Sequence, residues 1–293
     1  MLDYTLVNAC LQLGGEVKQV ADEGTGEVLP GACYKAHKGP VEYQGKVTAY
    51  KNGRLFEVSY PKQKAPQKGG GVRGKITGFS RSSRRRFMYT MAKVDQRGVL
   101  PLFATLTYPD EWVVDRDRME RDFRAMRRRI KRKGWGSFWR REWKPRESGL
   151  HVGEYYPHYH LLVWGVTLQE FIPWVTVAWW EVCGRLSENH LKAGTNVRSP
   201  NSWRQVTAYV SKYMAKLERM PEGFESLGRS WGVINREAIP WSEIDAATVG
   251  MPEVHTLFRY MRRYAGLKAR GGQRSMKIFC NDPSQWFANA LRC

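Results

Sequence analysis

Two histidines separated by one residue carry the clearest chemical signal in this sequence. His158 and His160 stand in Pro157-His158-Tyr159-His160-Leu161-Leu162, a stretch of aromatic and aliphatic residues typical of a β-strand. Side chains at positions i and i+2 of a strand point to the same face, so the two imidazoles would lie side by side. The spacing therefore predicts half of a divalent-metal site, although such a pair is also compatible with one buried, hydrogen-bonded histidine.

A carboxylate is expected to complete this site. Mg²⁺ and Mn²⁺ prefer oxygen ligands, although Mn²⁺ also accepts imidazole. Glu142 alternates onto one face of a predicted strand at Ser137–Trp143, and we expect that strand to pair with the histidine strand. Glu154, four residues before His158, is the local alternative. Both glutamates remain candidates at this point.

Two tyrosines and two lysines follow at helical spacing. Tyr209 and Tyr213 are i and i+4 and share a helix face, and Lys212 and Lys216 each come three residues after a tyrosine. A nearby ammonium would stabilise a phenolate, whose ordinary pKa is about 10, or neutralise a phosphate oxygen. A phenolate beside a metal can attack a phosphodiester and become covalently linked to it. The alternative is that both tyrosines only pack in an amphipathic stripe.

The elements that would position these side chains alternate between strands and helices. A helix is predicted over Ser80–Asp95, a strand over Leu102–Tyr108, a helix from about Asp115 to Lys133, strands over Ser137–Trp143, around the histidines and at Thr195–Arg198, and a helix opened by a capping box at Ser202–Gln205. Another capping box, at Thr167–Glu170, predicts a helix whose start Pro173 leaves open. This order predicts an α+β fold built on one antiparallel sheet.

The charge balance favours a polyanionic partner. The 293 residues contain 48 Lys and Arg against 28 Asp and Glu, a net charge of +20, which is typical of nucleic-acid binding. The helix from Asp115 has a predicted buried stripe of Met119, Phe123, Met126 and Ile130. Its other side is basic without interspersed acids, which favours phosphate contact over a merely solvated surface. The predicted nucleic-acid contacts are Arg84, Arg85, Arg124, Arg127, Arg128 and Lys131.

Other features bound the cellular context. The five cysteines form no closely spaced pair, so they indicate neither a disulfide framework nor a zinc cluster, and we expect a cytoplasmic protein. The N-terminus has no signal-peptide pattern. The most apolar stretch, Phe171–Cys183, is shorter than the roughly 20 residues that cross a bilayer, so no membrane partner is expected. Gly69 and Gly74-Lys75 only approximate a phosphate loop, because Ile76 stands where Ser or Thr belongs.

Three motifs in this order resemble those of the HUH endonucleases, the initiators of rolling-circle replication. They are Phe103–Asp110, Pro157–Leu162 and Tyr209-x-x-Lys212-Tyr213-x-x-Lys216, and the resemblance covers roughly residues 80–235. The pair of tyrosines resembles the two-tyrosine phage and plasmid type. Gly228–Val233 also resembles a stretch that follows the tyrosine helix in these relatives.

The resemblance implies a ferredoxin-like (RRM-like) fold with a five-stranded antiparallel sheet and flanking helices. It implies nicking of single-stranded DNA at an origin, leaving a 5′-phosphotyrosine and a free 3′-OH, with the host helicase and polymerase as candidate partners. His158 and His160 would hold a divalent metal, Mg²⁺ or Mn²⁺, and Tyr213 and Tyr209 would be the nucleophiles. The choice between Glu142 and Glu154 stays open, since the acidic ligand lies closer to the histidines in many relatives.

The predicted organisation is an N-terminal extension with a basic linker (residues 1–75), an endonuclease domain (76–235) and a C-terminal basic extension (236–293). The linker itself is predicted at Pro61–Gly74, and a hairpin is predicted before it, with strands Val47–Tyr50 and Leu55–Tyr60 around Asn52-Gly53. Two alternatives remain. One is a transposase or relaxase of the same chemistry, and the other is a non-catalytic basic nucleic-acid-binding protein.

Overall fold

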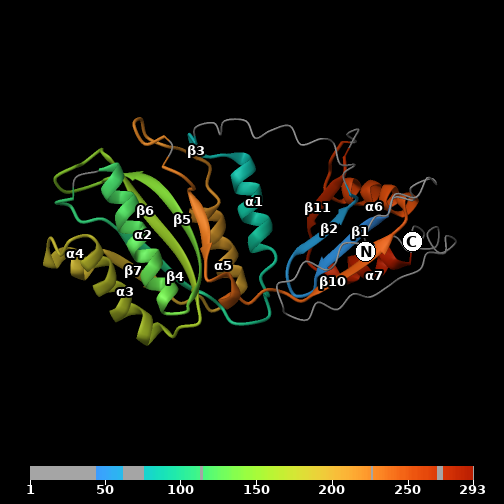
Figure 1. Cartoon of the computed structure of the whole chain (residues 1–293), viewed down its shortest axis with the longest axis horizontal. Coiled ribbons are helices and arrows are strands. Elements are labelled where there is room, and N and C mark those ends of the chain that lie inside the picture. The colour runs from blue at the N-terminus through green and yellow to red at the C-terminus, as the bar shows by residue number, and fades with distance from the viewer. Residues whose placement is uncertain (1–43, 62–75, 113–114, 226, 269–272, 293) are drawn as a thin grey trace, which may run out of the picture. The chain divides into compact units, whose positions relative to one another are not determined.

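The chain folds into two compact units, each with its own sheet and core. The computed structural model describes residues 44–61, 76–112, 115–225, 227–268 and 273–292 (Figure 1). One unit comprises Gly71–Met91 and Gln96–Pro240, and the other comprises Met1–Gly70, Ala92–Asp95 and Trp241–Cys293. The predicted linker, apart from Pro61, and the glycine-rich stretch with Gly69 and Gly74-Lys75 lie outside the described residues.

The first unit is built on a five-stranded antiparallel sheet in the order β7-β4-β6-β5-β9. Its strands are β4 (Leu102–Thr107), β5 (Gly136–Pro145), β6 (Tyr155–Trp164), β7 (Thr195–Arg198) and β9 (Trp231–Ile234). The α+β fold with a five-stranded antiparallel sheet is therefore confirmed. The pairing of the Ser137–Trp143 strand with the histidine strand is confirmed as well, because β5 and β6 form a long antiparallel hairpin.

The helices of this unit begin where the sequence places capping side chains. They are α1 (Arg81–Met91), α2 (Arg116–Arg132), α3 (Leu168–Val182), α4 (Glu188–Ala193) and α5 (Trp203–Tyr209). The side chains of Asp115, Thr167 and Ser202 each accept a backbone N–H of the first turn, which satisfies a donor without an intrahelical partner. Pro173 lies inside α3, so that helix begins before the proline.

Short elements complete the unit. A π-helix, η3 (Val210–Met214), continues directly from α5. The two-residue strands β3 (Gly78–Phe79) and β8 (Glu218–Arg219) pair with each other, and a 3₁₀-helix, η4 (Arg236–Ala238), follows β9.

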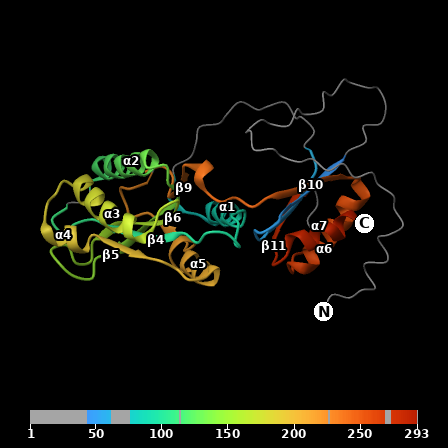
Figure 2. The same cartoon turned by 90° about the horizontal axis from the view of Figure 1, so that it is seen from below.

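The hydrophobic core lies between the sheet and helices α2 and α3. Figure 2 shows α2 on one side of the sheet and α5 on the other. The predicted buried stripe of α2 is confirmed, and its Phe123 ring stacks on Tyr159 of β6 with centroids 3.8 Å apart. Alternation along the strands sends Trp139 and Tyr159 into this core and their sequence neighbours to the opposite face. That opposite face is packed by α1, whose Phe87 contacts Phe138, and by α5 with η3.

The second unit is a four-stranded antiparallel sheet in the order β10-β1-β2-β11. Its strands are β1 (Gly45–Tyr50), β2 (Leu55–Ser59), β10 (Ile244–Val249) and β11 (Ser275–Phe279), and its helices are α6 (Met251–Tyr264) and α7 (Pro283–Leu291). The predicted hairpin around Asn52-Gly53 is confirmed by the β1–β2 pairing. Strands from both ends of the chain thus share one sheet, which differs from the predicted division into separate terminal extensions.

Two predictions about context meet the structure only in part. Across the described ranges, no helix combines the length and the apolar character needed to cross a membrane. Cys183 and Cys280 are buried free thiols. The remaining cysteines, Cys10, Cys33 and Cys293, lie outside the described residues.

Replacing Phe123 with alanine tests how much the α2 core contributes. Phe123→Ala removes a buried ring stacked on Tyr159 and leaves a cavity, so we expect the free energy of unfolding to fall by about 3–5 kcal/mol. Urea denaturation measures this change. The control Arg132→Ala, an exposed position of the same helix, should change it by less than about 0.5 kcal/mol. Equal changes in the two variants would contradict the assigned packing.

Candidate functional site

Three strands bring the predicted chemical groups onto one face of the larger sheet. In the β5–β6 register Glu142 lies opposite His158 and Arg140 opposite His160. In the β4–β6 register Thr107 lies opposite His158 and Thr105 opposite His160. The histidines are therefore flanked by hydroxyls on one side and by charged groups on the other, and this arrangement follows from strand alternation alone.

His160 is the centre of a buried hydrogen-bond network. Its Nε2 lies 2.7 Å from Glu142 Oε2, and its Nδ1 lies 3.2 Å from both the Thr105 and the Tyr209 hydroxyl oxygens. His160 and Glu142 are 3% and 1% exposed. The network assigns the tautomer, since a carboxylate can only accept: Nε2–H donates to Glu142, and Nδ1 accepts from a hydroxyl.

His158 is held in the same manner from β4. Its Nδ1 lies 3.2 Å from Thr107 Oγ1. Burial, together with the nearby positive charges of His160 and Lys144, lowers the pKa of His158 to about 4, so the imidazole is neutral near pH 7. A neutral imidazole with one nitrogen fixed by a hydrogen bond is the form that binds a metal through its other nitrogen.

Tyr209 is the more constrained of the two tyrosines. Its ring stacks on Phe103 of β4 with centroids 4.1 Å apart, and its hydroxyl is 3.3 Å from Thr105 Oγ1. Burial raises the pKa of Tyr209 to about 12, which opposes formation of its phenolate. The order Tyr209, His160, Glu142 nevertheless places an imidazole acceptor at the phenol and a carboxylate behind the imidazole.

Tyr213 lies in the π-helix η3, beside His160 and two ammonium groups. Its ring centroid is 5.3 Å from that of His160 and 5.0 Å from that of Tyr209. The Nζ atoms of Lys212 and Lys144 lie 4.9 and 5.8 Å from the same ring. Single turns of π-helix are frequent at functional sites, and this one sets where Tyr213 lies relative to the histidines.

The predicted lysines have different neighbours. Lys212 lies beside Tyr213, whereas Lys216 Nζ is 3.6 Å from Glu142 Oε1. Burial of Glu142 favours the neutral acid, but the hydrogen bond and charge of His160 and the charges of Lys144 and Lys216 outweigh it. The pKa of Glu142 is therefore below its ordinary value, and this carboxylate is ionised at neutral pH.

Glu154 lies apart from this network. It is in the loop before β6, with its carboxylate Oε1 3.1 Å from His151 Nδ1 and its side chain 58% exposed. Of the two glutamates considered for the metal, the structure brings Glu142 to His160 and leaves Glu154 with a different histidine.

The donor set matches a divalent cation in chemical type and in orientation. The threonine hydroxyls engage the Nδ1 atoms of both histidines, so each Nε2 is directed elsewhere, and Glu142 supplies oxygen at one of them. Over the described ranges, no three His, Cys, Asp or Glu side chains already converge at coordination distance. The 2.7 Å contact between Glu142 and His160 is the hydrogen bond that a cation would have to replace.

A buried ion pair that the sequence did not reveal supports this face of the sheet. Arg140 Nη2 lies 3.0 Å from Glu218 Oε2, and Glu218 also accepts the backbone N–H of Trp143. Arg140 is 1% exposed and lies over the Phe79 ring. Burial lowers the pKa of Arg140, and the carboxylate of Glu218 offsets part of that effect. The pair connects β5 to the segment just after the tyrosine helix.

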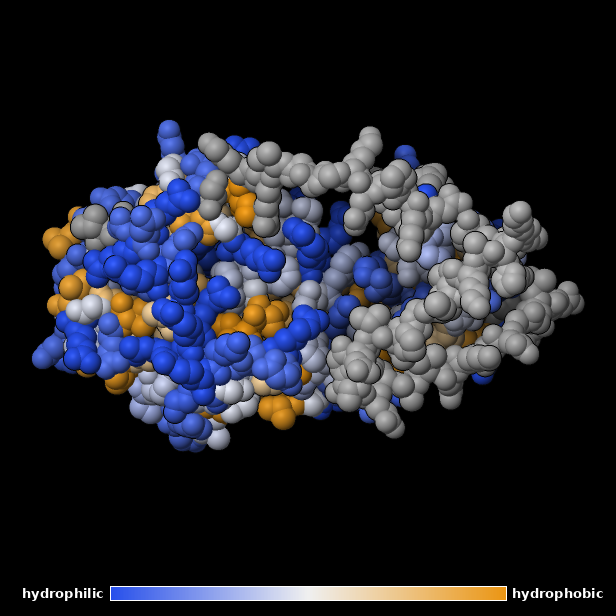
Figure 3. All heavy atoms as spheres, in the orientation of Figure 1, coloured by the Kyte–Doolittle hydropathy of each residue, from blue (hydrophilic) through white to orange (hydrophobic). Residues whose placement is uncertain are grey.

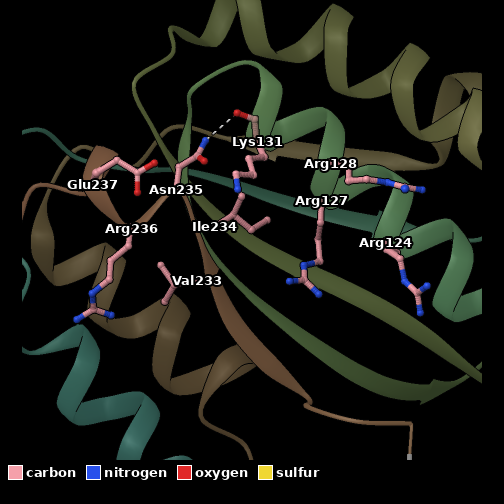
Figure 4. A pocket seen from close by; sticks show the side chains of 9 residues that line it. All are labelled: Arg124, Arg127, Arg128, Lys131, Val233, Ile234, Asn235, Arg236 and Glu237. Atoms are coloured by element: carbon pink, nitrogen blue, oxygen red, sulfur yellow. Dashed lines mark hydrogen bonds between the residues drawn. The ribbon is translucent and has the colours of Figure 1, made fainter.

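The predicted nucleic-acid contacts lie on two helices. Arg84 and Arg85 are exposed on α1. Four basic residues of α2 line a groove of about 580 Å³ beside the end of β9; they are Arg124, Arg127, Arg128 and Lys131 (Figure 4). In the space-filling view hydrophilic side chains gather over α2 (Figure 3). Since α2 covers the core face of the sheet, this groove is separated from the tyrosines by the sheet itself.

The region that contains the site has a recognisable relationship. Residues 101–218 match the model of the replication-associated protein ORF2 family. This match is consistent with a replication initiator. It extends from the start of β4 to β8 and includes both histidines, both tyrosines and Glu142. No curated protein and no solved structure gives a significant match to the chain.

Removing the partner of Arg140 tests the structural role of the buried pair. Glu218→Ala leaves the guanidinium of Arg140 buried without its carboxylate, so we expect the free energy of unfolding to fall by about 3–5 kcal/mol. Chemical denaturation measures this loss. The matched control Glu222→Ala removes an exposed carboxylate nearby and should change little. A loss below about 1 kcal/mol for Glu218→Ala would show that the pair does not hold these segments together.

Proposed function

We propose that this protein initiates replication by nicking and rejoining single-stranded DNA at an origin through a 5′-phosphotyrosine intermediate. The observation that carries the proposal is the convergence of two tyrosines, two imidazoles and a carboxylate on one sheet face. All of these side chains belong to the region that matches a replication-associated family. The net charge of +20 supports a nucleic-acid substrate.

In the first step a tyrosine oxygen attacks the scissile phosphorus. A tyrosine O–P bond forms, the P–O3′ bond breaks, and the leaving oxygen takes up a proton to become a free 3′-OH. The phosphate remains attached to the 5′ end of the DNA. Attack by a 3′-OH on the phosphotyrosine reverses the step and rejoins the strand. The 3′-OH left after nicking is the primer that a host polymerase extends, and a host helicase would separate the strands.

Tyr213 is the better candidate for the initiating nucleophile. Lys212 and Lys144 lie beside its ring, and a positive charge near a phenol favours the phenolate. By contrast, burial raises the pKa of Tyr209 to about 12, so Tyr209 is the poorer nucleophile in this arrangement. Tyr209 lies 5.0 Å from Tyr213 between ring centroids and is placed to act in a second transfer.

His158, His160 and Glu142 are the proposed ligands of a divalent cation, Mg²⁺ or Mn²⁺. When bound, the cation would polarise the scissile phosphate and offset the charge that develops on it. Thr105 and Thr107 orient the imidazoles toward it. Lys216 keeps Glu142 ionised and ready to act as a ligand.

Covalent capture tests the nucleophile. Wild-type protein incubated with Mn²⁺ and a labelled single strand that contains its origin should form an SDS-resistant adduct. Tyr213→Phe should lose the first adduct because phenylalanine lacks the attacking oxygen, whereas Tyr209→Phe should retain it. The opposite pattern would reverse the order of the tyrosines. If wild-type protein forms no adduct with any cognate strand, the chain is a non-catalytic basic nucleic-acid-binding protein instead.

The choice of DNA substrate separates the proposed initiator from a transposase or relaxase of the same chemistry. An initiator should nick the origin of its own replicon and support extension from the resulting 3′-OH by an added polymerase. Primer extension on a nicked supercoiled plasmid measures this. Activity confined to the ends of a mobile element would favour the transposase.

Metal binding tests the ligands without reference to activity. Isothermal titration with Mn²⁺ should show one site in the wild type, weakened at least about tenfold in His158→Ala and in Glu142→Gln, because each removes one donor. Glu154→Gln is the matched control and should bind like the wild type, since Glu154 faces His151. Loss of binding in Glu154→Gln together with normal binding in Glu142→Gln would exchange the two assignments.

A further inference from the structure

A basic groove lies on the core-side edge of the larger sheet, between α2 and β9. It consists of two adjoining hollows of about 580 and 370 Å³ that share Arg124, Arg127 and Val233. Arg124, Arg127 and Lys131 lie along one side of α2 and face the end of β9 (Figure 4). The groove is distinct from the site of the histidines and tyrosines, which lies on the opposite face of the sheet.

A buried arginine marks the floor of this groove. Arg141 of β5 is 4% exposed and lines the smaller hollow. Its Nε and Nη2 atoms have no hydrogen-bond partner within the described part of the chain. Leaving buried donors of a charged group unpaired is costly, so such a group indicates a ligand with acceptor oxygens. A guanidinium fork matches the geometry of a phosphate in particular.

The surrounding charges point to the same kind of ligand. Burial and the neighbouring charges of Arg124 and Arg229 lower the pKa of Arg127, which shows that three arginines crowd together here. The acidic groups at the groove are Glu120, whose carboxylate lies 3.8 Å from Arg124, and Glu237. They do not balance the cations, and like charges held together without equal counter-charge favour a bound anion.

The spacing along α2 indicates a chain of phosphates. Arg124, Arg127 and Lys131 span seven residues, or about 10 Å at the rise of an α-helix, which exceeds the reach of one phosphate group. The hydrogen bond from Arg141 N–H to the Ser230 carbonyl, 2.8 Å long, joins β5 to the segment that carries Arg229 and so brings another cation to the line.

We propose that the groove between α2 and β9 binds the backbone phosphates of a single-stranded DNA segment that is not being cleaved. The protein then holds DNA on both faces of one sheet: the scissile phosphate at the tyrosines, and a flanking segment along α2. Arg141 contacts a phosphate at the floor, and Arg124, Arg127 and Lys131 contact neighbouring phosphates. The inference rests on single-stranded DNA as the substrate of the proposed function.

Salt-dependent binding tests the groove. The probe is a labelled thymidine homopolymer, used with the full chain and EDTA so that no cleavage takes place. For single strands, the logarithm of the affinity falls with the logarithm of salt concentration by about 0.7 per phosphate contact. The double variant Arg124→Ala/Arg127→Ala should therefore show a slope shallower by about 1.4. Its affinity at low salt should fall at least about tenfold.

The control keeps the charge change and moves its position. Arg121→Ala/Arg132→Ala removes two exposed arginines of the same helix that do not line the groove. It should reduce affinity much less and leave most of the slope. Equal losses in the two double variants would overturn the proposal, because binding would then follow net charge alone. A groove-dependent preference for uridine over thymidine homopolymer would also overturn it, in favour of RNA.

The floor of the groove is tested separately with Arg141→Met, which keeps the length of the side chain and removes the fork. Weaker DNA binding with an unchanged circular dichroism spectrum supports the assignment of Arg141. Normal binding by a folded Arg141→Met would remove it from the site. If this variant does not fold, the paired α2 variants decide the proposal. The outcome is independent of the covalent assay, because wild-type protein that forms no adduct can still show groove-dependent binding, and the reverse.

Discussion

The register of three antiparallel strands is the constraint on which the site depends. Backbone hydrogen bonds between β4, β6 and β5 place Thr107, His158 and Glu142 in one row across the sheet and Thr105, His160 and Arg140 in the next. A sheet holds such rows at spacings of about 5 Å, so hydroxyl, imidazole and charged group meet without any flexible segment. The loops around the sheet do not determine this geometry.

The polar groups on this face are stable because nearly every one of them has a partner. His160 engages Glu142 and two hydroxyls, and Glu142 is also approached by Lys216. A half-satisfied network of this kind would be worse than an apolar surface, since buried polar groups are expensive when unpaired. The same rule makes the unpaired nitrogens of Arg141 informative: the exception occurs where a groove gives a ligand access.

Local patterns in the sequence were sufficient for most of the first unit. Alternation and capping residues predicted its central strands and helices, and the i, i+2 and i, i+4 spacings predicted that the histidines and the tyrosines would share faces. Contacts between distant segments were not predictable in this way. Arg140 and Glu218 are 78 residues apart, and β1 pairs with β10 across most of the chain. The π-helix also has no simple local signature, so the exact placement of Tyr213 required the structure.

Three consecutive residues of β5 serve both faces of the sheet: Arg140 and Glu142 point to the site of the tyrosines, and Arg141 points to the groove beside α2. Because strand side chains alternate, inserting or deleting a single residue before this triplet would exchange the faces and disable both surfaces at once. Changes of length in proteins with this fold should therefore accumulate in the loop between β5 and β6, around residues 146–154, where no such alternation has to be kept. The tip of the hairpin can vary in length, whereas its two strands cannot.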